Sequence, residues 1–293
     1  MVSMNKILIL LLAITVLSCK SPDRTSRDTV TVSISPFGYF VSTIAENDFS
    51  INIMVPAGSD PHIYEPSPDQ IASLRKSAAY ISDGYLGFEL TWLDRFFEAN
   101  TKMKLLTLGD STDIIMAKDH DGTGHPEGAD PHFWVSPKSA RPIAGAVLNL
   151  LCDLKPEMEA RYNYNYRRLL DTIDSIDKKA EEMLTGFDNN YFMVFHPTLS
   201  YIARDYGLVQ LAVEEEGKEP TPSSMKNLID EAIKRNIKVI FVMEEFDRKN
   251  ALTIASETGS VIRSINPLSE DWPDAVDEII TSLHSSLMSS NNK

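Results

Sequence analysis

The sequence predicts an α/β protein of two lobes joined by one long, rigid linking helix. Three features predict it: short β-rich runs alternate with amphipathic helical runs, a long stretch of helical periodicity follows, and the same alternation then resumes. Such alternation is typical of mainly parallel sheets with helical crossovers. At 293 residues and 43% hydrophobic, the chain is long enough to bury two cores rather than one.

The first lobe is expected to span residues 29–155. Its predicted strands are Thr29–Ser35, Ser50–Val55, Ala79–Ser82 and Lys104–Leu108, and its predicted helices are Phe37–Ala45, Pro68–Ser77 and Phe88–Ala99. A further helix begins at Pro137, since proline is favoured in the first helical turn. Ligands of open α/β sheets bind beyond the carboxyl ends of the strands, so the loops after the second and fourth strands should meet at one edge.

The longest periodic stretch, residues 156–187, predicts the helix that links the lobes. Apolar residues or tyrosines recur every three or four positions between Met158 and Met183, which places them on one helical face. Pro156 fits the first turn and Gly186 the end, and at ~1.5 Å per residue the helix would be about 48 Å long. We expect a rigid connector that packs against both lobes; a peripheral helix of a single domain is the alternative.

The second lobe is expected to span residues 188–293. Its predicted strands are Tyr191–Phe195, Val209–Val213, Ile237–Met243 and Val261–Ile265, and its predicted helices are Ser223–Arg235, Arg248–Thr258 and Pro273–Leu287. Thr221 can cap the first of these helices, which Pro222 opens. The acidic run Glu214–Glu216 is interpreted as a solvated loop rather than a set of ligands.

Residues 1–18 are interpreted as a signal peptide. Lys6 precedes the apolar run ILILLLAITVL, which has the length of a signal-peptide core and is too short to span a bilayer. The VLSC sequence that ends at Cys19 resembles a bacterial lipoprotein processing box and predicts lipidation of that cysteine; an ordinary secretory signal is the alternative. Residues 19–28 would then tether a periplasmic or other extracytoplasmic protein to a membrane.

The composition restricts the partners of the protein. A formal net charge of −14 argues against nucleic acid, whose phosphates favour a basic surface, and is compatible with a cationic ligand. With Cys19 lipidated, Cys152 has no cysteine partner within the chain, so it is expected to be a buried helix residue. We expect a monomer.

Five of the six histidines lie in three segments at the ends of predicted elements. His62 lies in GSDPHIYEP, His120, His125 and His132 lie in KDHDGTGHPEGADPHFWVSP, and His196 follows the strand YFMVF. Neutral imidazole is the commonest protein ligand for zinc and related metals. Scattered histidines on a solvated loop are the alternative. The strand-end positions nevertheless place His62 and His132 on one wall of the cleft between the lobes and His196 on the other.

Five segments together resemble the substrate-binding proteins of zinc and manganese ABC importers. They are DPHIYEPSPDQI, DPHFWVSP, the YNYNYRRLLDTID run, FHPTLSYIARDYGL and VIFVMEEFDRKNALTIASETGSV. The resemblance covers nearly the whole mature chain and implies two (β/α)4 lobes, limited hinge motion and one metal ion held in the inter-lobe cleft by His62, His132 and His196. It also implies that His120 and His125 lie in the variable His-rich loop of the zinc members. Because ordering this glycine-rich loop costs entropy, we expect at most a weak second site there.

The resemblance implies an extracytoplasmic lipoprotein that captures zinc and delivers it to an ABC importer permease. Three neutral imidazoles would hold Zn2+ with one tetrahedral position left open, while Asp60 and Asp130 could orient the rings or bind nearby backbone. Manganese-type relatives have a carboxylate in place of His196 and commonly an aspartate where this chain has Asn266. Since Asn266 offers only a neutral amide oxygen, it is a weak fourth ligand or none, and Mn2+ is the less favoured metal.

Two other functions are compatible with the residues. Three histidines with an open position also describe a zinc-dependent hydrolase, but the sequence has no HExxH motif and no evident general base. A surface adhesin or structural lipoprotein with incidental metal is the second, and such a site should bind zinc no more tightly than micromolar. We therefore expect a binding protein and not an enzyme.

Overall fold

The computed structural model describes residues 28–116, 128–214, 220–243 and 249–292. Within these ranges the chain forms two four-stranded parallel sheets. The first has the order β2-β1-β3-β4 and contains β1 (Asp28–Val32), β2 (Phe49–Ile53), β3 (Ser77–Ser82) and β4 (Lys104–Thr107). The second has the order β6-β5-β7-β8 and contains β5 (Tyr191–Val194), β6 (Val209–Ala212), β7 (Val239–Met243) and β8 (Val261–Ile265). The predicted two-lobe α/β fold is confirmed.

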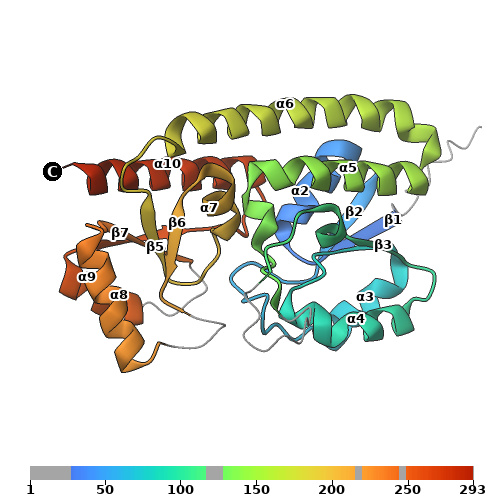
Figure 1. The fold of residues 1–293 in the computed structure, drawn as a ribbon. Coiled ribbons are helices and arrows are strands. Elements are labelled where there is room, and N and C mark those ends of the chain that lie inside the picture. Colours follow the sequence, from blue (N-terminus) through green and yellow to red (C-terminus); the bar gives the residue numbers. More distant parts are fainter. Residues whose placement is uncertain (1–27, 117–127, 215–219, 244–248, 293) are drawn as a thin grey trace, which may run out of the picture.

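Helices cover both sheets, and the long helix α6 runs across the two lobes (Figure 1). The α-helices are α2 (Ser35–Ala45), α3 (Pro68–Ser73), α4 (Gly87–Ala99), α5 (Pro137–Leu154), α6 (Glu159–Leu184), α7 (Ser200–Tyr206), α8 (Pro222–Lys234), α9 (Lys249–Thr258) and α10 (Trp272–Asn291). Short 3-10 turns are η1 (Leu74–Lys76), η2 (Leu108–Ser111), η4 (His132–Val135) and η5 (Pro156–Met158). In the part of the chain described, no helix combines the length and apolar character that a membrane span requires.

The predicted strands and helices are all present, with ends shifted by a few residues. The helix expected at Pro68–Ser77 is divided into α3 and η1, and its last residue already belongs to β3. The strand expected to reach Ser35 stops at Val32, because α2 starts at Ser35 with Pro36 in its first turn. Helix α7 was not predicted, since its seven residues are buried on several sides and show no single apolar stripe.

Helix α6 links the lobes as predicted, although residues 156–158 form a 3-10 turn before its 26 residues begin. It packs against α2 and α5 of the first lobe and against α10 of the second. Asn165 Nδ2 donates to the carbonyl of Ile44, 3.0 Å away, on the side of the first lobe. Lys179 Nζ lies 2.5 Å from Asp277 Oδ1 on the side of the second. One rigid helix therefore supports both lobes.

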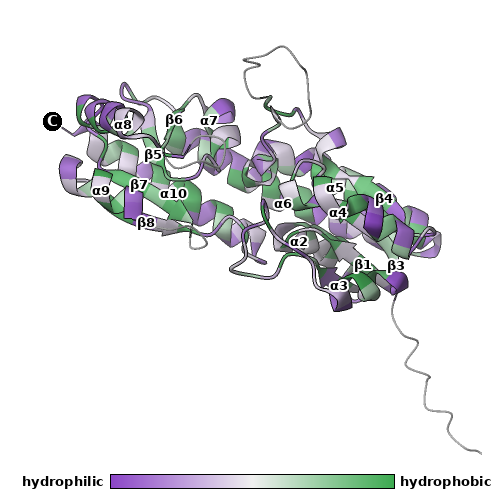
Figure 2. Ribbon diagram, turned by 90° about the horizontal axis from the view of Figure 1, so that it is seen from below, coloured by the Kyte–Doolittle hydropathy of each residue, from purple (hydrophilic) through white to green (hydrophobic). Residues whose placement is uncertain are grey.

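The hydrophobic interior is divided differently from the expected one core per lobe. A large cluster extends from the first sheet through α5, α6 and α10 to one face of the second sheet, and a smaller one lies under α8 and α9. Helix α10 and the strands beside it are largely green in Figure 2. Because α6 and α10 bury their apolar faces against both lobes, the main core is continuous across them.

Two tryptophans tie the lobes together directly. Trp134 Nε1 donates to the carbonyl of Pro267 at 2.9 Å, and Trp272 Nε1 donates to the carbonyl of Trp134 at 2.7 Å. Both side chains are buried, and Trp272 also packs against Phe40. Cys152 is a free cysteine in α5, but it is half-buried rather than buried as expected, because it lies toward the edge of that helix's packed face.

Candidate metal centre

Three imidazoles from the two lobes converge on one point. His62 follows β2, His132 opens η4 after the first sheet, and His196 follows β5 of the second sheet. Their Nε2 atoms lie 3.2 Å (His62 to His132), 3.1 Å (His62 to His196) and 3.2 Å (His132 to His196) apart. Among the described residues, these three form the cluster whose ligand atoms are close enough to share a metal ion. The structure thus brings together the three histidines singled out in the sequence.

The spacing of the nitrogens fits a tetrahedral ion. At Zn–N distances of ~2.0–2.1 Å, two nitrogens of a tetrahedral site lie about 3.3 Å apart. The observed separations of 3.1–3.2 Å are slightly shorter than this value. An ion placed a little out of the plane of the three nitrogens would reach all of them and keep its fourth position on the open side.

Two carboxylates orient the imidazoles from behind. Asp130 Oδ1 lies 2.8 Å from Nδ1 of His132, and Glu214 Oε2 lies 2.9 Å from Nδ1 of His196. Each carboxylate accepts a hydrogen bond from the protonated Nδ1, which leaves the Nε2 lone pair of the ring free to face the centre. One supporting carboxylate comes from each lobe.

The same local turn presents two of the histidines. In the Asp-Pro-His sequences that end at His62 and His132, the aspartate accepts a hydrogen bond from the backbone N–H of the histidine two residues on. These distances are 2.8 Å for Asp60 and 2.9 Å for Asp130. Asp130 therefore orients the ring and binds the backbone, whereas Asp60 binds the backbone, which are the two roles expected from the sequence.

Burial favours the neutral form of two of the imidazoles, those of His62 and His196. Desolvation, with smaller contributions from His132 and His196, lowers the pKa of His62 to about 2. Desolvation also lowers the pKa of His196, although the hydrogen bond that its Nδ1 donates to Glu214 opposes this effect. Burial alone would raise the pKa of Asp130, but the charge and hydrogen bonds of His132 outweigh it and lower that pKa. At neutral pH the rings of His62 and His196 are therefore neutral and the Asp130 carboxylate is ionised, which suits a divalent cation.

The interpretation of Glu214 as part of a solvated loop is wrong. Its side chain is 12% exposed and binds His196, while Glu215 and Glu216 lie outside the described residues. Strands β5 and β6 are parallel neighbours, and the backbone N–H of Glu214 donates to the carbonyl of Phe195 at 2.9 Å. The parallel register thus brings Glu214, which follows β6, close to His196, which follows the neighbouring strand β5. The strand-end position of Glu214 was the signal that could have identified it.

A buried acidic pair, Asp83 and Glu89, flanks the glycine that contacts the His62 turn. Glu89, at the start of α4, accepts hydrogen bonds from the backbone N–H groups of Asp83 (2.9 Å) and Gly84 (2.6 Å) and from the Ser33 hydroxyl. Burial raises the pKa of Glu89 to about 7 and that of Asp83 well above its ordinary value. Between them, Gly87 approaches His62 so closely that an added Cβ would lie 2.3 Å from the carbonyl oxygen of that histidine. Sequence reasoning did not find this arrangement.

Of the remaining candidates, Asn266 lies within the described residues and is not part of the three-histidine cluster. Asn266 is exposed, and its carboxamide oxygen accepts a hydrogen bond from the backbone N–H of Leu268 at 3.1 Å. His120, His125 and Cys19 lie outside the described residues.

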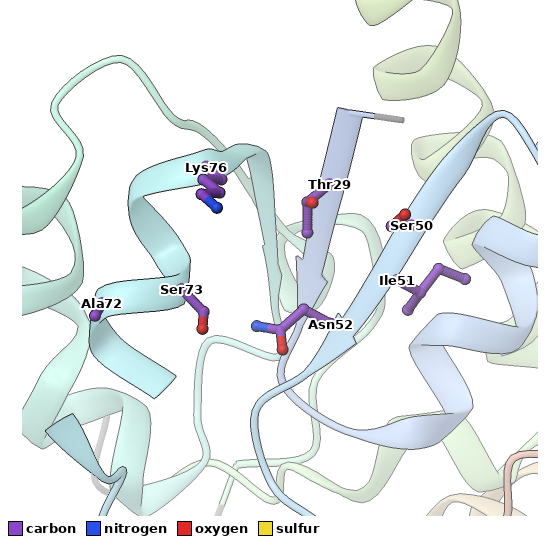
Figure 3. Close-up of a pocket in the computed structure, with 7 residues that line it drawn as sticks. All are labelled: Thr29, Ser50, Ile51, Asn52, Ala72, Ser73 and Lys76. Atoms are coloured by element: carbon purple, nitrogen blue, oxygen red, sulfur yellow. The ribbon is translucent and has the colours of Figure 1, made fainter. Parts of the chain in front are cut away.

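A polar groove of about 450 Å³ lies on the first lobe, between β1, β2 and the helical turn that carries Lys76 (Figure 3). Its lining residues are Thr29, Ser50, Ile51, Asn52, Ala72, Ser73 and Lys76. Lys76 supplies the only formal charge in this lining, and the polar side chains are those of serine, threonine and asparagine. None of the three converging histidines lines the groove, so it is separate from the candidate metal centre.

Known proteins are similar to this chain in fold and in part of the sequence. The chain is 25% identical to the zinc-binding lipoprotein AdcA of Streptococcus pneumoniae (strain ATCC BAA-255 / R6) over 250 residues, 82% of this chain and 50% of that protein. It is 23% identical to the high-affinity zinc uptake system protein ZnuA of Bacillus subtilis (strain 168) over 252 residues, 82% of this chain and 78% of that protein. A crystal structure of ZnuA matches 89% of this chain and 99% of its own, with 32% identity and a TM-score of 0.83.

The chain spans about half the length of the streptococcal relative. The family model for the periplasmic component A of the zinc-uptake complex matches residues 30–286, which include both sheets, α6 and the three histidines. The chain therefore belongs to the family of the periplasmic zinc-uptake complex component A (ZnuA).

Proposed function

We propose that the protein is an extracytoplasmic binding protein that captures zinc between its lobes and delivers it to the permease of an ABC importer. The observation that carries the proposal is the set of three Nε2 atoms at 3.1–3.2 Å, each belonging to a buried or half-buried ring. Family membership supports the transport role, because AdcA and ZnuA are named as zinc-binding and zinc-uptake proteins.

Zinc is the cargo that this donor set favours. Three nitrogen ligands suit zinc better than manganese, which prefers oxygen, and the divalent affinity series also favours zinc. The supporting carboxylates of Asp130 and Glu214 balance the two positive charges of the ion. Asn266 supplies no charge and binds its own loop, so the fourth position is left for water or for a carboxylate from elsewhere.

The chain is proposed to act outside the inner membrane, held there by a lipid on Cys19. The apolar run before Cys19 and the processing box support this placement, and the name of the streptococcal relative as a lipoprotein agrees with it. Residues 19–28 would let the folded part move near the membrane and meet the permease. The protein is proposed to work as a monomer.

A hydrolase function is not favoured by the geometry. A zinc hydrolase needs a base beside the open coordination position to activate water. The carboxylates of Asp130 and Glu214 instead accept hydrogen bonds on the far side of the imidazoles, at Nδ1. These contacts stabilise a bound ion without supplying a general base.

The decisive experiment combines elemental analysis of the purified protein with competitive zinc and manganese titration. His62→Ala, His132→Ala and His196→Ala should each weaken zinc binding by orders of magnitude and leave thermal unfolding of the zinc-free protein nearly unchanged. His284→Ala is the matched control, since this histidine lies on α10 and binds the carbonyl of Met183 at 2.6 Å. The proposal is wrong if His196→Ala binds zinc like the parent, or if the parent binds zinc no more tightly than micromolar.

Delivery is tested in cells. Deleting the gene from its own host should slow growth in zinc-depleted medium, and the parent should restore growth while His196→Ala should not. Restoration of growth by His196→Ala would contradict a role of the three-histidine site in zinc supply.

A further inference from the structure

The short helix α7 belongs to the second lobe but is bonded to the first. It begins four residues after His196 and packs against η4, the turn that starts with His132. The chain segment that supplies one histidine thus also reaches the segment that supplies another.

Tyr201 makes the central contact of this helix. Its side chain is buried, and its hydroxyl accepts a hydrogen bond from the backbone N–H of Ile115 at 3.0 Å. The same hydroxyl donates to the carbonyl of Asp130 at 2.7 Å. The ring of Tyr201 meets Phe133 edge to face, with centroids 6.3 Å apart. One oxygen atom of the second lobe therefore holds the backbone of Asp130, whose carboxylate orients His132.

Further polar contacts of α7 flank this hydroxyl. Arg204 Nη1 donates to the carbonyl of Asp113 at 2.6 Å. The carboxylate of Asp205 accepts a hydrogen bond from the hydroxyl of Ser136, the N-cap of α5, and Lys138 Nζ donates to the carbonyl of Asp205 at 3.0 Å. The helix is thus bonded to the first lobe on both sides of His132 in the sequence.

We propose that Tyr201 is a positioning residue that sets the place of Asp130 and His132 relative to His196. The inference rests on the proposed zinc-binding function. It adds Tyr201 as a residue that supports the metal centre without being a ligand. A ligand that meets a preformed set of donors loses less free energy to ordering than one that must assemble them. Without the hydroxyl, Asp130 and His132 can shift relative to His196, so zinc should bind more weakly and dissociate faster.

The test is Tyr201→Phe, which removes one oxygen atom and keeps the ring. The matched control is Tyr206→Phe on the same helix, where the hydroxyl of a buried tyrosine donates to Asp177 of α6 at 2.7 Å. Tyr201→Phe should weaken zinc affinity about 5- to 30-fold, near the lower end of the roughly 10- to 100-fold loss that follows removal of a direct partner of a ligating histidine, because Tyr201 acts one residue further away. Tyr206→Phe should stay within twofold of the parent, even if both variants lower the unfolding temperature of the zinc-free protein alike.

A double-mutant cycle separates positioning from general stability. If Tyr201 acts through Asp130, then Tyr201→Phe should cost much less zinc affinity in an Asp130→Asn background than in the parent. Should Tyr201→Phe not fold, Arg204→Gln is the second variant: it loses the contact to Asp113 and should weaken zinc binding two- to fivefold.

The results distinguish failure of the positioning role of Tyr201 from failure of the proposed zinc-binding function. Parent-like zinc affinity of Tyr201→Phe, or an equal loss in Tyr206→Phe, overturns the positioning role while the loss in His196→Ala still supports zinc capture. Where Tyr201→Phe does not fold, Arg204→Gln is tested in its place. Parent-like zinc affinity of Arg204→Gln then also overturns the positioning role. If the parent itself fails to bind zinc, the proposed function and the positioning role both fall.

Discussion

Glu214 allows a quantitative test of how the second lobe tunes the metal centre. Its carboxylate accepts a hydrogen bond from Nδ1 of His196 at 2.9 Å, and its side chain is 12% exposed. Glu214→Ala removes this acceptor together with one negative charge and leaves the three imidazoles in place. Any loss of zinc affinity would then come from outside the set of ligands.

The expected loss follows from the geometry. Through the imidazole ring, the carboxylate would lie about 6–7 Å from the ion, where a charge and a divalent cation attract each other by about 5 kcal/mol at an effective dielectric constant of about 20. This is an upper limit, because water enters the vacated space and the ring keeps its packing. Losing such a partner of a ligating histidine typically costs about 10- to 100-fold in affinity, or about 1.4–2.7 kcal/mol. Glu214→Gln keeps an acceptor without the charge and should cost less.

The assay is competition with a chromogenic zinc chelator at pH 7.5, together with the zinc dissociation rate by stopped flow. Thermal unfolding of the zinc-free variants checks the fold. The matched control is Glu231→Ala, the same substitution on the exposed face of α8, where Glu231 pairs with Lys234. If the zinc dissociation constant of Glu214→Ala is within twofold of that of the parent, the proposal that Glu214 supports His196 by accepting a hydrogen bond from its Nδ1–H is refuted.

Three further predictions follow from the surroundings of the site. Because burial lowers the pKa of His62 to about 2 and also lowers that of His196, these two rings should take up fewer protons than ordinary imidazoles as the pH falls. In competitive titration between pH 7.5 and 5.5, their contribution to the loss of zinc affinity should therefore be far smaller than the roughly hundredfold that two ordinary imidazoles, with pKa of about 6.5, would lose. Because the pKa of Glu89 is raised from 4.5 to about 7, the folded protein keeps a proton that the unfolded chain loses, so its stability falls as the pH rises through that window. Relative to the parent, Glu89→Gln should therefore gain up to about 3 kcal/mol of unfolding free energy between pH 5 and 7.5 in denaturant titrations, and a constant difference would contradict this. Gly87→Ala should shift the His62 turn, since the new Cβ would lie 2.3 Å from its carbonyl oxygen, and weaken zinc binding at least tenfold; parent-like affinity would show that the turn yields without moving the ring.

Sequence periodicity was sufficient for most of the elements, and residue type together with strand-end position singled out the three histidines. Alternating β-rich and helical runs have local periods, and parallel strands end at one edge, so His62 and His196 could be placed before their contacts were known. Helix α7 has no such period, because its residues face both lobes. Tyr201 meets Asp130 across 71 residues of chain, and no local pattern encodes that pairing.

Supporting residues escaped detection for the same reason. Glu214 lies in an acidic run that resembles solvent-exposed sequence, and only the pairing of β5 with β6 brings it to His196. Gly87 and Glu89 sit in an ordinary helix start, where nothing in the sequence marks the close approach of Gly87 to His62 or the backbone N–H groups from which Glu89 accepts hydrogen bonds. Candidate metal-binding side chains can be recognised from residue type. The side chains that support them can be identified only once the three-dimensional pairing of the strands and helices is known.

In the proposed function, the distribution of carboxylates would link zinc capture to zinc release. Asp130 belongs to the first lobe and Glu214 to the second, so the two negative charges that balance a divalent ion come together only when the lobes are adjacent. A buried cation is stable where its charge is compensated, and it becomes costly when a compensating group moves away. Separating the lobes would remove His196 and Glu214 from the ion at once, together with the hold of Tyr201 on Asp130. A permease that draws the lobes apart would thereby weaken ligand, charge and positioning contacts in a single movement.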